Sequence, residues 1–471
     1  MSFLSKVTDL LWTPWLLGLF LLTGLFFSLR TGFFQLFGFR IWWRESIGRL
    51  FRGGGGHAHR GISQIQALST ALAATIGTGS IAGVATAIFY GGPGAVFWMW
   101  ISAFLGMMTG CAEKTLAVRY RRGIPGGWQG GPMYYMEDGL GSRPLGVWFA
   151  LLCIAQTLIG GDLVQSNSIA TSLTASFGFR ALPVGIAAAV LTGCVIFGGI
   201  GRIGRVSERL VPCMAALFLL GGLAVLAVHA RDIPNVLRDI FTQALSPKAA
   251  CGGYGAAAAL RYGVARGVFT NEAGLGTSAI AHAAADVDDP ARQGMWGILE
   301  VFIATLVICT MTALVILSSG VYDPAAALDA IASGQVSDSM LGAPLSAAAF
   351  ATVFGPFGGV FVSICLILFA FTSLLGACYY GEQCLLYLTG SARLVPAYRL
   401  FFLGMTVLGS VGDLSAAWLL VDLSNALMAV PNLAALLLLS GQASALILQC
   451  ARSPRQEKEK RKIFSKIHRQ K

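Results

Sequence analysis

Charged residues are scarce in this chain. Asp, Glu, Lys and Arg make up 12% of the 471 residues, whereas hydrophobic residues make up 55%. The mean hydropathy is +0.70. A soluble domain needs about twice that share of charged residues, so this composition excludes one. We therefore expect an integral membrane protein.

Motifs for catalysis and for metal binding are missing as well. The ten cysteines include no Cys-x-x-Cys pair, and the five histidines supply no ligand cluster. The sequence also has no nucleophile elbow, no phosphate-binding loop and no His-Glu-x-x-His motif. We therefore expect no enzyme, no disulfide framework and no cofactor, and no metal beyond a transported sodium ion.

Long apolar runs take the place of those motifs. A spanning helix needs about 20 mostly apolar residues. We interpret the first run as a retained helix, because it is too long for the apolar core of a signal peptide. The sequence predicts eleven spans: Leu10–Leu29, Ser63–Tyr90, Gly94–Val118, Leu145–Ser176, Leu182–Ile200, Glu208–His229, Tyr254–Ala284, Gln293–Ser319, Ala347–Leu388, Tyr398–Val411 and Ala416–Leu448.

Two basic segments account for the net charge of +11. Phe37–Gly61 carries five Arg against Glu45, and Arg452–Lys471 carries nine Lys and Arg against two Glu. Basic loops beside spans stay in the cytoplasm. We therefore predict a multi-pass protein of the inner or plasma membrane, with the N-terminus outside and the C-terminus cytoplasmic. The basic tail is expected to contact anionic lipid and not nucleic acid.

Glycines interrupt two predicted spans that lie about five helices apart. One is Ser69–Tyr90 and the other is Gly263–Ala285. Broken helices at matching positions of two halves are typical of transporters built from inverted repeats, which hold substrate near the middle of the membrane. The predicted organisation is an extra N-terminal helix with a basic segment (1–61), a first repeat (62–230), an extracellular connection (231–253), a second repeat (254–448) and a basic cytoplasmic tail (449–471).

Eight sequence blocks occur in order along the chain: ATIGTGSIAGVATAI (Ala74–Ile88), GGPGAVFWMW (Gly91–Trp100), GGPMYYM (Gly130–Met136), QSNSIA (Gln165–Ala170), GRVSERLVP (Gly204–Pro212), RGVFTNEAGLGTSAIAHAAA (Arg266–Ala285), FAFTSLLGACYYGE (Phe369–Glu382) and NALMAVPN (Asn425–Asn432). Together they resemble the alanine or glycine:cation symporters of the amino acid–polyamine–cation superfamily. The resemblance implies an all-α integral membrane protein with about eleven transmembrane helices, one extra helix followed by a five-plus-five inverted repeat with two broken helices. It also implies uptake of alanine, D-alanine or glycine, coupled to sodium by alternating access; we expect a monomer.

The candidate substrate site combines both breaks. Unwinding at Gly77–Gly79 would direct backbone N–H groups at the substrate carboxylate. Phe269 would wall off a small side chain, and freed carbonyls nearby would accept from the ammonium. The alternatives are close helix packing for the glycines and lipid or core contact for Phe269. The full set of candidates is Gly77, Thr78, Gly79, Gln165, Phe269, Asn271, Gly274 and Ala377.

The candidate cation site follows from the resemblance. In the superfamily a pair of hydroxyls faces backbone carbonyls of the first broken helix and binds sodium. The matching hydroxyls are Thr372 and Ser373, and the carbonyls are those of Ala73 and Ile76. Sodium prefers such hard oxygen ligands. The alternative is that both hydroxyls bond to their own helix.

Three departures from the family pattern suggest a changed site. Ser80 and Ala304 stand where the family usually has Asn and Asp. Two further carboxylates, Asp162 and Glu300, lie inside spans, and we expect one of them to compensate charge or to carry a proton. Snorkelling near a helix end is the alternative. Ala377 replaces the usual Trp, which predicts room for a larger side chain.

Two other functions remain compatible with the sequence. One is proton-coupled transport of a larger neutral amino acid such as glutamine. The other is a membrane receptor that transports nothing. A channel is less favoured, because the spans lack the rings of charge that line ion pores.

Overall fold

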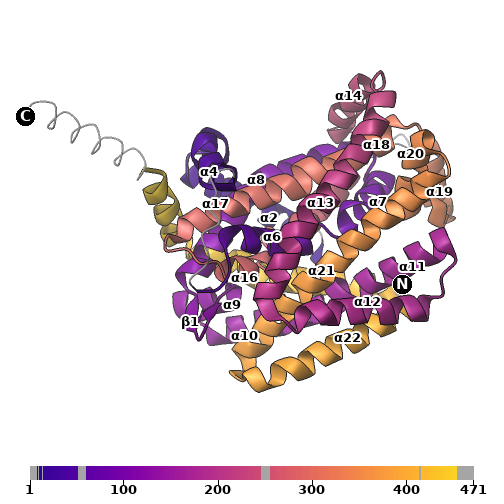
Figure 1. The fold of residues 1–471 in the computed structure, drawn as a ribbon. Coiled ribbons are helices and arrows are strands. Elements are labelled where there is room, and N and C mark those ends of the chain that lie inside the picture. The colour runs from indigo at the N-terminus through magenta and orange to yellow at the C-terminus, as the bar shows by residue number, and fades with distance from the viewer. Residues whose placement is uncertain are drawn as a thin grey trace, which may run out of the picture.

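Helices make up almost all of the fold (Figure 1). The computed structural model describes residues 8, 10–12, 14–50, 60–245, 255–412 and 415–452. Within them, seven helical stretches are long and apolar enough to cross a membrane, and four more apolar helices are shorter.

Each of the eleven predicted spans contains helix. In seven the main part is one unbroken helix: α2 (Pro14–Arg30), α8 (Gly94–Arg119), α12 (Ala181–Ile196), α13 (Gly199–Val228), α21 (Phe357–Thr389), α22 (Val395–Val411) and α23 (Ser415–Leu438). Two contain a π-helical segment: α10 (Arg143–Leu158) runs through η3 (Ile159–Leu163) into α11 (Val164–Phe177), and α17 (Pro290–Val301) runs through η5 (Phe302–Cys309) into α18 (Thr310–Ser318). Two are broken: α6 (Gln64–Thr75), η1 (Thr78–Ser80) and α7 (Ala82–Gly91) form one, and α15 (Ala256–Asn271) and α16 (Ser278–Ala283) form the other.

The predicted span Ala347–Leu388 was wrong at its start. Residues up to Phe354 belong to a separate helix, α20 (Gly342–Phe354), which has 13 residues. That is about 20 Å, which is too short to cross a bilayer upright. Gly355, with φ +55°, turns the chain before α21 begins. The sequence hid this boundary because both helices are equally apolar.

Short elements join the long helices. The loop after α8 forms a hairpin of β1 (Arg122–Ile124) and β2 (Gly127–Gln129), in which Gly123 pairs with Trp128. The others are α3 (Phe34–Phe37), α4 (Phe39–Glu45), α5 (Ile47–Leu50), α9 (Pro132–Tyr134), η2 (Tyr135–Gly139), α14 (Ile233–Ala244), α19 (Pro324–Ser333), η6 (Asp338–Met340) and η7 (Ala392–Leu394).

Local chemistry explains where the first broken helix begins and ends. Ser63 and Gln66 form a capping box, in which each side chain accepts from the other residue's backbone N–H. The helical conformation stops after Thr75, because Ile76 has ψ 68° and Gly77 is extended.

The second broken helix changes direction through left-handed backbone. Glu272 has φ 53°, Gly274 has φ +95° and Gly276 has φ +85°. Glycine adopts these angles without steric cost, whereas a residue with a side chain such as Glu272 does so uncommonly.

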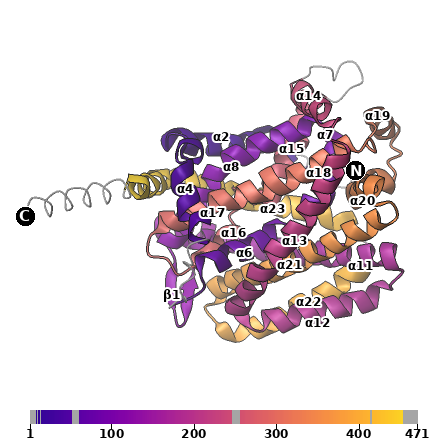
Figure 2. The ribbon, with the colours of Figure 1, turned by 45° about the horizontal axis from the view of Figure 1, so that its top comes forward.

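The two broken helices lie at the centre of the helix packing. Figure 2 shows α6, α16 and α21 in the middle, with α2 and α8 on one side and α11, α12 and α22 on the other. A bridge between Ile62 and Ala285 joins the start of α6 to the end of α16. The breaks therefore face each other inside the protein and not toward lipid.

Candidate substrate and cation site

A small cavity lies between the two helix breaks. Six of the predicted site residues line it: Gly77, Gly79, Gln165, Phe269, Ser373 and Ala377. The rest of the wall comes from Ala74, Thr75, Gln156, Gly160, Gly161, Thr270, Glu272, Leu275, Tyr380 and Asn425. The wall therefore joins α6, α10, η3, α11, α15, α21 and α23 at one place.

Gly77 is where three of these elements meet. The N–H of Thr78 donates to Gln165 Oε1 at 3.4 Å, and Gln165 Nε2 donates to the Gly160 carbonyl at 3.3 Å. A Cβ at Gly77 would lie 2.7 Å from Ser373 Oγ. Only glycine therefore lets the first break approach α21 this closely.

Phe269 separates the small cavity from a larger one. Its ring lies against Gly79, where a Cβ would be 3.2 Å away, and the Arg266 guanidinium stands 5.1 Å from the ring centroid. Phe269 also lines the larger cavity, of about 550 Å³, together with Arg266, Tyr90 and Asp422. The Phe269 side chain is thus placed to act as a gate between the two.

Asn271 and Gly274 lie outside the cavity wall. Asn271 Oδ1 accepts from the Ala273 N–H at 3.0 Å, and its Nδ2 donates to Thr305 Oγ1 at 3.2 Å. The Gly274 N–H donates to Glu113 Oε1 at 2.9 Å. Both residues form hydrogen bonds around the second break, and their predicted contact with a substrate stays a prediction.

Ser373 and Ala73 come together as predicted. Ser373 Oγ lies 3.1 Å from the Ala73 carbonyl and 3.4 Å from that of Ala74, and it also lies 3.1 Å from the Phe369 carbonyl of its own helix. Ile76 is buried beside them, and its N–H closes the last turn of α6 on the Leu72 carbonyl.

Thr372 faces the other way. Its hydroxyl donates to the Phe369 carbonyl of its own helix at 3.0 Å and lies 3.5 Å from Met214 Sδ. Both hydroxyls therefore make the contact to their own helix that we weighed as the alternative, but only Ser373 also contacts the Ala73 carbonyl.

Ser80, Ala304 and Asp162, three of the residues that depart from the family pattern, are buried near η5 and α22. Ser80 Oγ is buried without a hydrogen-bond partner among the described residues, and Ala304 lies in the π-helical η5. Asp162 is fully buried and accepts from the Thr406 hydroxyl at 2.8 Å. Asp162 therefore faces α22 and not the cavity.

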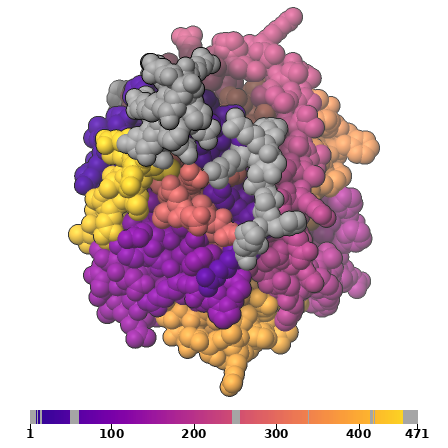
Figure 3. All heavy atoms as spheres, turned by 60° about the vertical axis from the view of Figure 1, so that its left-hand side comes forward, coloured from indigo at the N-terminus to yellow at the C-terminus, as the bar shows by residue number. Residues whose placement is uncertain are grey.

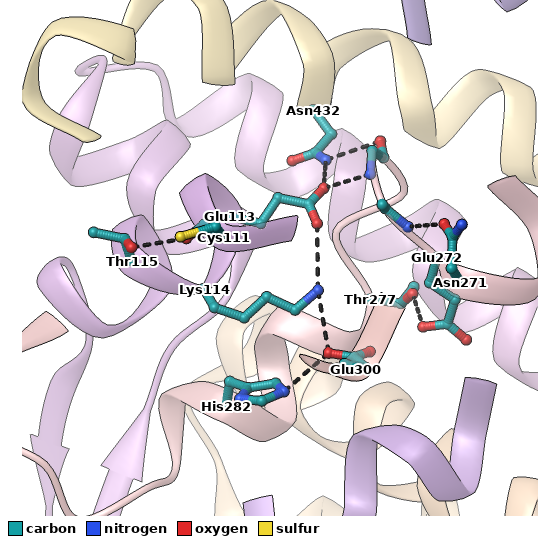
Figure 4. Close-up of polar contacts among 12 residues, drawn as sticks. Cys111, Glu113, Lys114, Thr115, Asn271, Glu272, Thr277, His282, Glu300 and Asn432 are labelled. Atoms are coloured by element: carbon teal, nitrogen blue, oxygen red, sulfur yellow. Dashed lines mark hydrogen bonds and ion pairs between the residues drawn. The ribbon is translucent and has the colours of Figure 1, made fainter. Parts of the chain in front are cut away.

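Glu300 belongs to a buried charge cluster that the sequence analysis missed. Lys114 Nζ lies 3.6 Å from Glu113 Oε2 and 3.4 Å from Glu300 Oε2, and all three side chains are 0% exposed (Figure 4). His282 Nε2 is 3.0 Å from the same Glu300 oxygen. The adjacent Glu113 and Lys114, inside the apolar run Gly94–Val118, were the signal that would have revealed this cluster.

Two amide side chains of the wall were also missed. Gln156 lines the cavity, and so does Asn425, whose two amide atoms are buried without a hydrogen-bond partner in the described part of the chain. A buried amide without partners costs free energy, which a polar ligand would recover. Asn425 stands in the NALMAVPN block, and its apolar neighbours were the only sign in the sequence that this amide side chain is buried.

The β1–β2 hairpin closes the end of the molecule away from the larger cavity. Arg121 donates to the backbone carbonyls of Ala283 and Val287, at 3.3 and 2.6 Å. Trp128 is sandwiched between Arg60 and Arg121, whose guanidinium carbons stand 4.5 and 4.0 Å from its ring centroid. Figure 3 shows this face, where the purple hairpin region adjoins the salmon-coloured chain leading from α16 to α17.

Ion pairing also stabilises the hairpin. Arg122 donates to both Asp138 oxygens, at 3.0 and 2.7 Å. These hydrogen bonds raise the pKa of the Arg122 guanidinium above its ordinary value, although partial burial opposes the shift. The Arg122 guanidinium therefore stays charged at every physiological pH.

Comparison with known proteins identifies the family. The model of the sodium:alanine symporter family matches residues 1–465. The chain belongs to this family. It is a multi-pass membrane transporter, an amino-acid symporter and not an enzyme.

Two relatives are similar over most of their length. The sodium/alanine symporter AgcS of Methanococcus maripaludis is 41% identical over 451 residues, which are 93% of this chain and 95% of AgcS. The probable sodium/glutamine symporter GlnT of Bacillus subtilis is 37% identical over 432 residues, 92% of this chain and 87% of GlnT.

Solved structures of the same fold are more distant in sequence. MhsT in complex with L-phenylalanine matches with a TM-score of 0.58 at 13% identity, over 83% of this chain and 96% of that one. The Eremococcus coleocola manganese transporter matches with a TM-score of 0.55 at 14% identity, over 83% of this chain and 85% of that one. Their likeness confirms the predicted all-α fold with inverted repeats, while the repeat boundaries at 62–230 and 254–448 stay a prediction.

Proposed function

We propose that this protein takes up alanine, D-alanine or glycine together with sodium, by alternating access. The observation that carries the proposal is the cavity between the two breaks, where Gly77 and Gly79 expose backbone and Gln165 and Phe269 supply one polar and one apolar wall. An amino-acid carboxylate fits the positive end of the half helix that begins after the first break.

The packing at Ala377 supports a small substrate. A Cβ added at Gly161 would overlap the Cβ of Ala377, so η3 and α21 are in direct contact there. Backbone therefore fills part of the space that a Trp would take at position 377. The second candidate substrate is a larger neutral amino acid such as glutamine. It is supported by Ala377, which stands where the family usually has Trp, and by the likeness to GlnT.

Uptake into proteoliposomes tests the proposal. Radiolabelled L-alanine, D-alanine, glycine and glutamine are supplied with an inward sodium gradient, and then with a proton gradient in sodium-free buffer. Sodium-driven uptake of alanine or glycine supports the proposal. Uptake of glutamine alone, or uptake driven by protons alone, supports the second candidate, and no uptake of any of the four contradicts both.

The adjacent hydroxyls Ser373 and Thr372 form a matched pair for testing the cation site. We expect Ser373→Ala to raise the sodium concentration for half-maximal uptake about tenfold, because losing one good oxygen ligand costs roughly 1.4 kcal/mol, in the range of a hydrogen bond to a charged group. Thr372→Val should change it less than twofold, because that hydroxyl lies against Met214 and, unlike Ser373, not against the Ala73 carbonyl. Sodium titrations of initial uptake rates measure both.

Equal effects of the two substitutions would contradict this assignment. A strong effect of Thr372→Val alone would mean that the hydroxyl turns toward Ala73 in another state of the transport cycle. A substrate affinity that rises with sodium in the parent and not in Ser373→Ala would add independent support, since coupling between two ligands is reciprocal.

The orientation in the membrane is also a proposal. We place the β1–β2 hairpin and the C-terminus in the cytoplasm and the end with the larger cavity outside, following the basic segments. The tail 453–471, with its expected lipid contact, lies outside the described residues. An epitope tag after Lys471 should be accessible to antibody only in permeabilised cells; labelling of intact cells would reverse the orientation. The monomeric state stays a prediction.

A further inference from the structure

The buried cluster has a defined arrangement of charge. Lys114 lies between Glu113 and Glu300, one on each side (Figure 4). Glu113 Oε1 also accepts from the Gly274 N–H at 2.9 Å and from Asn432 Nδ2 at 2.8 Å. Because Glu113 accepts two hydrogen bonds and lies beside the cation of Lys114, its contacts fit the ionised form of the carboxylate. The cluster thus reaches the backbone of the second break.

The hydrogen bonds of His282 fit its neutral form. Gln64 Nε2 donates to Gln293 Oε1 at 3.0 Å, which leaves the amide nitrogen of Gln293 facing His282 Nδ1 at 2.7 Å. Nδ1 is then an acceptor, so Nε2 carries the only ring proton and donates it to Glu300. His282 therefore adds no positive charge.

Glu272 is a third carboxylate in the same electrostatic neighbourhood. It lines the substrate cavity, and one of its oxygens accepts from the Thr277 hydroxyl. Within the described residues, no Lys, Arg or His lies at ion-pair distance from it. Glu272 has left-handed backbone, with φ 53°, so a charged residue occupies a position in the break where glycine would be the ordinary choice.

The groups facing Glu272 do not neutralise it. The titratable groups that interact with it electrostatically are Glu113 and Lys114 on α8, Glu300 on α17, Tyr380 on α21 and Cys153 on α10. Only Lys114 is cationic, and two carboxylates already share it. With all three glutamates ionised, three negative charges would face one positive charge in the protein interior, which is strongly unfavourable without a further cation.

We propose that Glu272 holds a proton while the cavity is empty and gives it to water when the ammonium group of an amino acid enters. The ammonium then supplies the positive charge that the proton supplied before. After the amino acid leaves on the other side, Glu272 takes up a proton there. This inference rests on the proposed function for its transport step: one proton moves against the direction of the amino acid.

Substrate binding to the purified full-length protein tests the exchange. Calorimetric titration of alanine at saturating sodium, in buffers of different ionisation enthalpy, should show release of up to one proton. The alanine dissociation constant should rise as the pH falls, by about tenfold per pH unit on the acid side, because one proton competes with one ligand. Glu272→Gln should bind alanine more weakly and without dependence on pH.

A second variant and a surface control separate this role from a structural one. Thr277→Val removes the hydroxyl donor and with it some stabilisation of the ionised carboxylate, so the binding curve should move to higher pH and keep its shape. Asp239→Asn, on the exposed side of α14, should leave binding and its pH dependence unchanged.

Infrared spectra of the substrate-free parent and of Glu272→Gln give a readout that needs no substrate: their difference should contain the band of a protonated carboxyl, present in the parent and absent in the variant. In a second comparison, this band should be lost from the parent when alanine binds. The absence of that band, proton uptake in place of release on binding, or an unchanged pH profile in Glu272→Gln would each overturn the proposal. If no amino acid binds at any pH, the proposed function fails, and the substrate-free band still decides whether Glu272 carries the proton.

Discussion

Gly77→Ala should lower uptake about 100-fold, as expected for a misplacement of about 1 Å at a site of this kind, while the protein folds normally. The backbone at Gly77 is extended, with φ −101° and ψ −163°, so alanine adopts it without strain. The new methyl group would lie 2.7 Å from Ser373 Oγ and 3.5 Å from Gln165 Oε1. To avoid it, Ser373 must leave the Ala73 carbonyl or the first break must move away from α21.

Uptake in proteoliposomes measures the loss of transport, and elution from a size-exclusion column shows whether the variant folds normally. Gly18→Ala is the matched control, because a Cβ at Gly18 in α2 meets nothing within 4 Å. It should leave uptake unchanged. Uptake by Gly77→Ala within twofold of the parent would show that substrate and sodium bind elsewhere.

Lys114→Met should produce the largest loss of stability. The side chain is 0% exposed and lies between two carboxylates, so the substitution keeps most of the volume and leaves Glu113 and Glu300 without their cation. Removing one partner of a buried ion pair costs about 3–5 kcal/mol. We expect the midpoint of thermal unfolding in detergent to fall well below that of the parent.

The double variant Lys114→Met with Glu300→Gln isolates the charge. It removes one carboxylate along with the cation, and the Gln side chain still accepts from His282. It should recover much of the lost stability, since a buried pair replaced as a whole is far less costly than a broken one. A double variant no more stable than Lys114→Met would mean that packing of the lysine chain, and not its charge, stabilises this region.

Apolar length and glycine placement predicted the helical spans and the two breaks, and the family resemblance added the five-plus-five arrangement. A helix at each of the eleven spans and two breaks about five helices apart follow from local chemistry, because a bilayer demands about 20 apolar residues and tolerates broken backbone only beside a cavity. The boundary between α20 and α21 did not follow, since a change of direction at Gly355 leaves the apolar run intact.

The structure brings some of the predicted site residues together, and their binding roles stay predictions. Gly77, Gly79, Gln165, Phe269, Ser373 and Ala377 meet at one cavity, as their motifs indicated. Asn271 and Gly274 instead stabilise the second break, and Thr372 turns to its own helix. Adjacent residues on a helix point about 100° apart, so only one of two neighbouring hydroxyls can face the first break directly.

The sequence by itself determined the class of protein, the helical spans and the family, because each depends on patterns along one stretch of chain. The tertiary structure alone decided which charges are partners. Lys114 and Glu300 are far apart in sequence, and their pairing, like that of Glu300 with His282, exists only because α8, α16 and α17 pack together. Burial makes a charge costly unless another element brings its partner, and that pairing is a property of packing and not of any local pattern.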